Sequence, residues 1–363
     1  MESFSSTYNE ARDKFLAAAQ KLGAKIESIQ HPKDGPNGES IFTDVALIGH
    51  PDPKNFFILG SGTHGVEGFT GSGIQTGLLR NKIGEQLEPG SGLLFIHAIN
   101  PYGFAHLRRT NEDNIDLNRN FIDHSRPYPT NEGYAELAGV ICPKSISGWD
   151  NIYLRLRFLL YQLKHGRGAL LKAVSGDQFS HPEGLFFGGH HESWSSKTLK
   201  DIAQRYLCNA RRVIFIDFHT GLGAFGDAEV ILNVGPHAPE YKRAADIWGD
   251  RVKSTVDGGA VSVDLDASVK LAVPGMIPQA EVTAVSLEYG TYPPTDVFFA
   301  LRAENWLHHF GGDGHPKSKK IKRELLRVFY PESDKWKLSV WNIGKEVVEQ
   351  ALNYLQPASA NTN

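Results

Sequence analysis

Short apolar runs alternate with amphipathic stretches along most of this chain. The apolar runs cover residues 24–30, 44–50, 55–61, 92–101, 211–219, 228–234 and 282–289. Helical periodicity extends over 7–22, 132–138, 149–174, 194–210, 237–252, 294–310, 317–330 and 333–355, and residues 62–81 open with glycines before turning helical. Short apolar runs between turn residues are typical of buried strands, and a helical period is typical of amphipathic helices. Their alternation predicts an α/β fold with a mixed, mostly parallel central sheet flanked by helices.

The same pattern predicts how the chain is organised. Residues 1–355 are expected to form a single domain, in which 124–193 make a helical insertion, and 356–363 are expected to form a frayed tail. The runs 44–50 and 55–61 are separated by Pro-Asp-Pro-Lys, which favours a hairpin or two adjacent strands. Functional loops in such sheets follow the carboxyl ends of the strands, so candidate functional residues are expected there.

Composition narrows the class of protein. The 363 residues are 40% hydrophobic and 22% charged with a net charge of −3, as in an ordinary globular chain without a basic stripe for nucleic acid. Cys142 and Cys208 are too few for a disulfide framework. The N-terminus lacks a leader pattern, and no apolar run approaches the roughly 20 residues of a membrane span. These features favour a cytoplasmic protein with neither a membrane nor a nucleic acid as partner.

The first candidate for chemistry is His64-x-x-Glu67, in a glycine-rich loop directly after the apolar run 55–61. At the start of a helix, residues three apart share one face, so one imidazole and one carboxylate can reach a single ion. The pattern is weak by itself, because the chain has 15 histidines and His237–Glu240 repeats the spacing. That second copy opens an amphipathic helix, where a capping or surface role is expected.

A second candidate, His219, ends the apolar run 211–219. A lone histidine after a strand is more often a hydrogen-bonded structural residue. Zinc hydrolases, however, need three protein ligands and an open position for water. His64, Glu67 and His219 supply that number and mixture of ligands from two strand ends.

The stretch after His219 offers a competing interpretation. Gly221, Gly223 and Gly226 spell G-x-G-x-x-G, which would indicate an NAD-dependent oxidoreductase. That motif requires a helix that opens within it, so that the pyrophosphate meets free N–H groups. The apolar, β-branched run 228–234 predicts a strand instead, so we expect these glycines to let the chain turn sharply after His219. A serine hydrolase is also disfavoured, because the chain has no G-x-S-x-G elbow.

Two further stretches place polar residues at strand ends. The loop after the run 92–101 carries five of them: Arg108, Arg109, Asp116, Asn118 and Arg119. Arg can bind a carboxylate through a bidentate fork and Asn adds a neutral donor, although a solvated loop with salt bridges would show the same residues. Glu288 ends another apolar run, a position that suits either a buried ion pair or a general base beside a metal-bound water.

Taken together, these stretches resemble the zinc carboxypeptidase superfamily, the carboxypeptidase A-like metallohydrolases. The shared order is H-x-x-E, then N-P-x-G…R…D-L-N-R-N-F, then a strand that ends in His and a strand that ends in Glu. The D-L-N-R-N-F segment is the most specific of these motifs. The sequence looks closest to a bacterial branch related to the succinylglutamate desuccinylase and aspartoacylase group.

The resemblance implies a metal site. His64, Glu67 and His219 would bind one Zn²⁺ ion. Asp116 matches a position that orients the first zinc histidine from behind.

The resemblance also implies roles in catalysis and substrate binding. Glu288 would take a proton from the zinc-bound water and pass it to the leaving nitrogen. Arg109, which the spacing to D-L-N-R favours over Arg108, would stabilise the oxyanion of the tetrahedral intermediate. Asn118 and Arg119 would hold the terminal carboxylate of the substrate.

The function implied is that of a zinc hydrolase that cleaves an amide or peptide bond next to a free carboxylate, as a carboxypeptidase does. The substrate would be a small peptide or an N-acyl amino acid. Two alternatives remain, a deacylase of N-acyl amino acids and a non-catalytic carboxylate-binding module. Digestive members of the family use a flexible tyrosine, to which neither Tyr289 nor Tyr292 aligns securely. The loop 181–196 is equally consistent with a pocket lining and with a structural loop.

Overall fold

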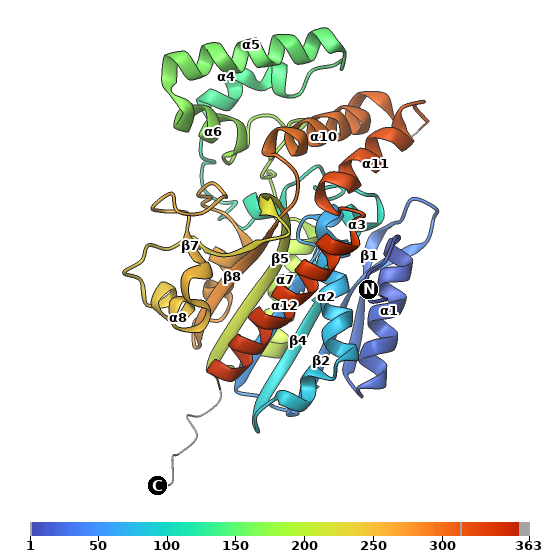
Figure 1. Ribbon diagram of the computed structural model, residues 1–363, viewed down its shortest axis with the longest axis vertical. Helices are drawn as coiled ribbons and strands as arrows, with labels where there is room; N and C mark the ends of the chain where they lie inside the picture. The colour runs from blue at the N-terminus through green and yellow to red at the C-terminus, as the bar shows by residue number, and fades with distance from the viewer. Residues whose placement is uncertain (1, 313, 356–363) are drawn as a thin grey trace.

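The computed structural model describes residues 2–312 and 314–355. These residues form an eight-stranded sheet in the order β1-β2-β4-β3-β5-β8-β6-β7 (Figure 1). The strands are β1 (Lys25–Asp34), β2 (Ser40–Gly49), β3 (Asn55–Ser61), β4 (Ser91–His97), β5 (Arg212–Phe225), β6 (Ala228–Leu232), β7 (Val252–Ser254) and β8 (Glu281–Gly290).

Helices cover the sheet and its upper edge. They are α1 (Tyr8–Lys21), α2 (Gly68–Arg80), α3 (Pro101–Ala105), α4 (Glu132–Ile141), α5 (Gly148–His165), α6 (Arg167–Ser175), α7 (Trp194–Leu207), α8 (Pro239–Trp248), α9 (Val269–Met276), α10 (Pro294–Trp306), α11 (Ser318–Phe329) and α12 (Asp334–Tyr354). Within residues 2–312 and 314–355, no helix is both long and apolar enough to span a bilayer.

Parallel pairing at the centre of the sheet brings several strand ends to one edge. β3 pairs in parallel with β4 and β5, and β5 pairs in parallel with β8. β1, β2 and β4 pair antiparallel, as do β6 and β8. The predicted single α/β domain with a mixed, mostly parallel sheet flanked by helices is confirmed. The carboxyl ends of β3, β5 and β8 therefore lie side by side, where sheets of this class carry their sites.

Three details differ from the sequence-based expectation or lie beyond it. The hairpin or adjacent pair predicted for 44–50 and 55–61 is wrong, because β4 lies between β2 and β3. β3 is buried along nearly its whole length and needs a hydrogen-bonded neighbour on each side, which local hydrophobicity does not identify. The predicted helical stretch 149–174 consists of two helices, which are separated at Gly166 with a φ of 88°. The predicted tail, 356–363, lies outside the described residues.

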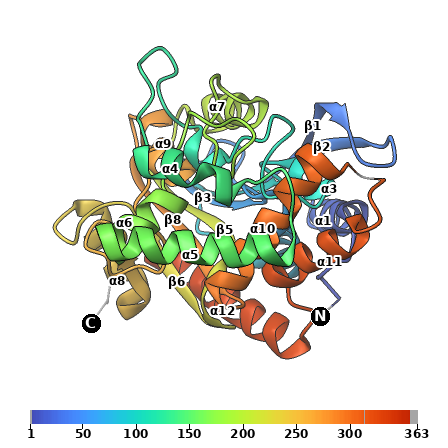
Figure 2. The same cartoon turned by 90° about the horizontal axis from the view of Figure 1, so that it is seen from above.

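Two cores lie on opposite faces of the sheet. Figure 2 shows α7 and α9 on one side and α1, α8 and α12 on the other. Successive residues of β5 alternate between these faces: Ile214 packs with α1, α2, α8 and α12, whereas Val213 and Phe215 pack with α7 and α9. Because side chains alternate along a strand, Asp217 and His219 continue the α7–α9 side.

A third group of buried side chains lies above the carboxyl edge of the sheet. It joins α4 and α6 to α10 and α11, and α5 lies across the top of this group (Figure 1). α5 buries Leu154 and leaves large apolar side chains such as Trp149 and Leu163 exposed. The helices that lie within residues 124–193 therefore cover the carboxyl ends of the strands.

The loop after β3 packs tightly against the loop after β4. The N–H groups of Gly65 and Val66 donate to the carbonyls of Arg109 and Arg108, at 3.2 and 2.8 Å. A Cβ atom at residue 65 would lie 1.9 Å from the carbonyl carbon of Gly103. Only glycine permits this approach of two backbones, so the two loops have one relative position.

We expect Gly65→Ala to lower the free energy of unfolding by about 1–3 kcal/mol, because the new methyl group clashes with backbone that cannot rotate away. Gly139→Ala is the matched control. Gly139 is exposed within α4, and a Cβ there has no neighbour within 4 Å. The higher helix propensity of alanine should therefore raise the free energy of unfolding by up to about 1 kcal/mol. Urea unfolding measures both changes, and equal stabilities of the two variants would contradict the tight loop packing.

Candidate metal centre

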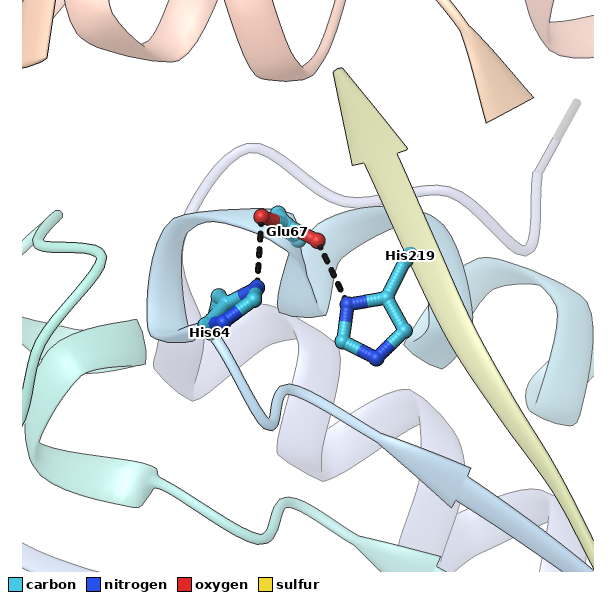
Figure 3. Close-up of side chains that lie close together, drawn as sticks. All are labelled: His64, Glu67 and His219. Atoms are coloured by element: carbon cyan, nitrogen blue, oxygen red, sulfur yellow. Dashed lines mark hydrogen bonds and ion pairs between the residues drawn. The ribbon is translucent and has the colours of Figure 1, made fainter. Parts of the chain in front are cut away.

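His64, Glu67 and His219 meet beyond the carboxyl end of β3, where its pairing with β5 stops. His64 precedes a short 3-10 helix, Gly65–Glu67, and Glu67 is its last residue. His219 belongs to β5, which runs parallel to β3, so that the loop after β3 reaches the end of β5. Residues distant in sequence are thus brought to one point, as Figure 3 shows.

The carboxylate of Glu67 lies between the two imidazoles. One oxygen is 2.9 Å from Nδ1 of His64 and the other is 3.0 Å from Nδ1 of His219 (Figure 3). The N–H of Thr220 donates to the second oxygen at 3.0 Å, which fixes the plane of the carboxylate. All three side chains are buried, and one ligand atom of each lies within 4.8 Å of the others.

Each imidazole is held from behind by a carboxylate. Nε2 of His64 lies 3.1 Å from Asp116, and Nε2 of His219 lies 2.7 Å from Asp217. Asp217 also accepts the hydroxyl hydrogen of Thr63 at 2.8 Å. When each Nε2 donates to its carboxylate, the Nδ1 lone pairs of both histidines face the carboxylate of Glu67. Two imidazoles and a carboxylate with this support form a donor set that suits Zn²⁺, so the residues present fit a divalent metal.

Charge in this cluster is held away from water. Burial disfavours the ionised form of Glu67, but the neighbouring His64 and His219 lower the pKa of its carboxyl below the usual value. Burial likewise disfavours the imidazolium of His219, yet Asp217 and Glu67 raise its pKa to about 10. Besides the guanidinium of Arg109, the buried anions therefore need a further positive partner at this point, either a proton on an imidazole or a metal ion.

The two adjacent arginines serve different parts of the structure. Arg109 donates to Glu67 and to Asp116, both at 3.0 Å, and so lies beside the three candidate ligands. Arg108 is fully buried and donates to Glu304 of α10 and to Asn114, both at 2.9 Å. Arg109 is therefore placed at the candidate centre, whereas Arg108 ties the loop to α10.

Asn118 and Arg119 follow Asp116 in the same loop. Two nitrogens of the Arg119 guanidinium donate to Asp116 at 2.7 Å and to the carbonyl of Ser175 at 2.6 Å. Its Nε has no hydrogen-bond partner within the described part of the chain. The side-chain oxygen of Asn118 accepts the N–H of Val269 at 3.1 Å, which leaves the amide nitrogen as the group free to face a ligand.

Glu288 lies beside His219 on the neighbouring strand. The two residues are register partners in the parallel pair of β5 and β8, so their side chains share one face of the sheet. The N–H of Leu222 donates to the Glu288 carboxylate at 3.1 Å. Burial and, after it, the charge of Glu67 raise the pKa of Glu288 to about 7. A cation at the adjacent ligands would lower this pKa and leave Glu288 as a proton acceptor.

The glycines after His219 shape the end of β5. Gly221, Gly223 and Gly226 have φ values of 136°, 110° and 77°. The expected sharp turn directly after His219 is wrong, because β5 remains a strand as far as Phe225 and bulges in its pairing with β8. Strand β6 follows rather than a helix, so this glycine motif has no helix N-terminus to offer a pyrophosphate.

A cavity of about 370 Å³ opens onto these residues. Its lining includes the three candidate ligands and four of the other predicted site residues: His64, Glu67, His219, Arg109, Asn118, Arg119 and Glu288. Asp116 lies behind this wall, against His64. A larger and more open groove of about 910 Å³, beside α7 and α9, touches none of these residues. The candidate site is therefore the cavity at the strand ends, where the charged groups converge.

Several residues of the cavity carry no sequence signature. Lys270 in the first turn of α9, Ser286 of β8 and Arg167 at the start of α6 all line it. The sequence gives one indication of Lys270: it is the single charged residue in the stretch 267–273, whose other residues are small or apolar. No spacing or motif connects that lysine to the histidines and Glu288.

Other residues considered from the sequence have separate positions. Phe186, in the loop 181–196, lines the cavity. Its ring packs over the guanidinium of Arg119, whose central carbon lies 4.6 Å from the ring centre. Tyr289 is buried in the core between the sheet and α12, and Tyr292 packs against Arg327. Neither tyrosine is among the residues that line the cavity in the described part of the chain.

Comparison with known proteins gives one family match and several similar solved structures. A family model described as a protein of unknown function (DUF2817) matches residues 4–343, and no curated protein matches. Similar solved structures include thrombin-activatable fibrinolysis inhibitor, with 12% identity, a TM-score of 0.46, and coverage of 95% of this chain and 74% of that one. Carboxypeptidase A from Helicoverpa armigera has 14% identity, a TM-score of 0.45, and coverage of 90% and 75%.

A succinylglutamate desuccinylase from a Silicibacter species has 14% identity, a TM-score of 0.40, and coverage of 79% of this chain and 67% of that one. These structures include members of both groups that the sequence motifs resemble. At such identities and TM-scores, the chemistry of the site rests on its own residues.

We expect the purified protein to bind about one divalent metal ion per chain and His64→Ala to lose it, because two ligands cannot replace a three-ligand site. His237→Ala is the matched control, since His237 belongs to the second H-x-x-E sequence but is exposed. Elemental analysis after purification without chelators measures the metal. Wild-type protein without near-stoichiometric metal, or unchanged binding in His64→Ala, would rule out this centre.

Proposed function

The chain belongs to the family described as proteins of unknown function (DUF2817), and we propose that it is a zinc-dependent hydrolase that cleaves an amide or peptide bond next to a free carboxylate. One observation carries the proposal: Glu288 faces the same cavity as His64, Glu67 and His219, and is the cross-strand neighbour of His219. A proton acceptor beside a three-ligand metal site is the arrangement that hydrolysis by an activated water requires.

Each residue of the cavity wall has a separate task in this proposal. When bound, Zn²⁺ lowers the pKa of a water molecule and polarises the substrate carbonyl. Glu288 accepts the proton of the attacking water and gives it to the leaving nitrogen. Arg109 donates to the oxygen on which negative charge develops. Its contacts with Glu67 and Asp116 hold its guanidinium at the centre before any substrate arrives.

Asn118 and Arg119 bind the free carboxylate of the substrate in this proposal. The amide nitrogen of Asn118 is already oriented by the bond between its oxygen and Val269, so it loses little freedom on binding. The Nε of Arg119 has no hydrogen-bond partner among the described residues and lies 3.8 Å from a carboxylate oxygen of Asp177, so its N–H is left to donate to a ligand. Together they offer a neutral and a charged donor to one carboxylate.

Two reactions that use the same residues differ in the group that carries the attacked carbonyl. A carboxypeptidase releases the last residue of a peptide, whereas a deacylase releases an amino acid from a short acyl group. In both reactions the free carboxylate belongs to the released amino acid and the attacked carbonyl precedes its nitrogen. Carboxypeptidase-like action is the leading hypothesis, and deacylation of N-acyl amino acids is the alternative.

Glu288→Gln should retain the metal but lower kcat by roughly 10²- to 10⁴-fold, because the amide keeps the oxygen that accepts from Leu222 but cannot take a proton. Glu240→Gln, in the second H-x-x-E sequence, is the matched control and should turn over normally. Initial rates and metal content are measured on the same samples. Full activity of Glu288→Gln would remove Glu288 from the catalytic role.

Blocked dipeptides with a free C-terminus should be cleaved, and their C-terminal amides should be roughly 10- to 100-fold poorer substrates, the effect of losing a charged hydrogen bond. N-acetyl and N-succinyl amino acids are tested in parallel. Cleavage of the acyl compounds alone would assign the protein as a deacylase, and equal cleavage of acids and amides would contradict carboxylate binding.

A further inference from the structure

The cavity contains a cation that none of the proposed catalytic steps uses. Lys270 lies in the first turn of α9 and lines the cavity together with Glu288 and the three candidate ligands. Within the described part of the chain, its ammonium makes a hydrogen bond to the hydroxyl of Ser286 at 3.2 Å and no ion pair with a carboxylate.

Each of the three arginines near the centre already contacts a protein carboxylate. Arg108 is paired with Glu304 at 2.9 Å, and Arg109 is shared between Glu67 and Asp116. Arg119 is paired with Asp116 at 2.7 Å. Lys270 differs from all of them, because its charge is placed in a partly buried cavity without a protein carboxylate in contact. A cation in that position is the natural partner of an anion on the ligand.

The place of Lys270 indicates which part of a substrate would meet it. Ser286 precedes Glu288 by two residues on β8, so both side chains are on one face, about 7 Å apart along the strand. Lys270 therefore lies deeper in the cavity than the proposed proton acceptor. The side-chain oxygen of Asn118 accepts the backbone N–H of Val269, the residue before Lys270. Asn118, which we propose to donate to the substrate carboxylate, is therefore a close neighbour of Lys270. The side chain of the leaving amino acid would extend from the bound carboxylate toward Lys270.

Three polar atoms without a hydrogen-bond partner lie in the wall of the same cavity. The hydroxyls of Ser262 and Ser268 and the side-chain oxygen of Asn233 are buried without a hydrogen-bond partner among the described residues, and all three residues line the cavity. Buried polar groups normally find partners in the protein or in a ligand. The two hydroxyls can donate hydrogen bonds to a carboxylate, whereas the oxygen of Asn233 can only accept one.

The charge of Lys270 persists near neutral pH. Burial lowers its pKa to about 8, although Glu288, Asp217 and Asp264 counteract this change. The ammonium form therefore predominates at pH 7. Asp217 is hydrogen-bonded to His219 and Thr63, and Asp264 to Thr255 and Asn233, and neither carboxylate forms an ion pair with Lys270 in the described part of the chain.

We propose that Lys270 binds an anionic side chain on the leaving amino acid, so that the site prefers substrates that end in an acidic residue such as glutamate. This inference rests on the proposed hydrolase function for its kinetic consequences. The chemistry is common to a peptide with a C-terminal glutamate and to an N-acyl glutamate, because both carry the same leaving amino acid.

The test compares substrates that differ only in charge. Blocked dipeptides ending in Glu or Gln, and N-acetyl-Glu against N-acetyl-Gln, are hydrolysed by wild type, Lys270→Met, Lys270→Glu and the surface control Lys21→Met. We expect the wild type and Lys21→Met to favour Glu over Gln by roughly 10- to 100-fold in kcat/KM, the effect of one charged hydrogen bond. In Lys270→Met the ratio should fall to near one.

Lys270→Glu should invert the preference toward a dipeptide that ends in Lys. A wild-type ratio near one would overturn the inference. So would an equal loss of kcat/KM for Glu and Gln substrates in Lys270→Met, because Lys270 would then serve a group that all substrates share. The peptide and acyl arms show which of the two sources of glutamate the site accepts.

A binding measurement separates this inference from the proposed hydrolysis. Calorimetry with free glutamate and free glutamine uses wild type and Lys270→Met, whose thermal unfolding temperatures are compared first. Glutamate binding that depends on Lys270, in a protein that hydrolyses none of the substrates, would support the acidic subsite and contradict the hydrolase. Hydrolysis without any preference for charge, and without preferential glutamate binding, would support the hydrolase and contradict the acidic subsite.

Discussion

Glu67 carries a negative charge in a place that is 1% exposed, and the surrounding elements are arranged to compensate for it. Two imidazoles, the guanidinium of Arg109 and the N–H of Thr220 all contact its carboxylate. An unpaired buried carboxylate would cost several kcal/mol, so each of these groups must stay in place for the folded state to be stable. The ends of β3 and β5 and the loop after β4 are therefore coupled through one side chain.

The fold meets this requirement through the backbone. Parallel pairing brings the ends of β3, β5 and β8 to one edge, and strand alternation turns His219 and Glu288 toward the same face. The loop that carries Arg109 is fixed by two backbone hydrogen bonds to the Gly65–Val66 segment, at a distance only glycine allows. A site held by backbone geometry is preorganised, because its charged groups do not need to be reoriented when a ligand arrives.

The cations of the cavity differ in how far the protein itself already pairs them. The fork-shaped guanidinium ions of Arg108, Arg109 and Arg119 each bridge two or more partners in the protein. Lys270 offers a compact point charge with a hydroxyl as its protein partner. This difference follows the chemistry of the two side chains, since a planar fork suits fixed bidentate contacts and an ammonium accepts a partner from many directions.

The sequence alone determined the α/β class, the place of the long strands and the strand ends that carry His64, Glu67, His219 and Glu288. Hydrophobic runs of limited length encode strands locally, and parallel strands necessarily bring their ends to one edge. The three-ligand arrangement was therefore foreseeable as a cluster, and the structure brings these residues together. The glycine motif after His219 was also separable from a dinucleotide site, because the residues that follow it predict a strand.

Tertiary structure decided what depends on partners distant in the chain. The position of β4 between β2 and β3 follows from the need of a buried strand for two neighbours, which no local pattern expresses. The resemblance favoured Arg109 over Arg108 at the centre, but the partner that holds Arg108 elsewhere is Glu304, nearly 200 positions away, and no motif indicates it. The same holds for Lys270. Its proposed role follows from its hydrogen bond to Ser286 and from the lack of a contacting carboxylate among the described residues. Desolvation and pairing of charges are properties of the folded surroundings, so a sequence motif cannot state them.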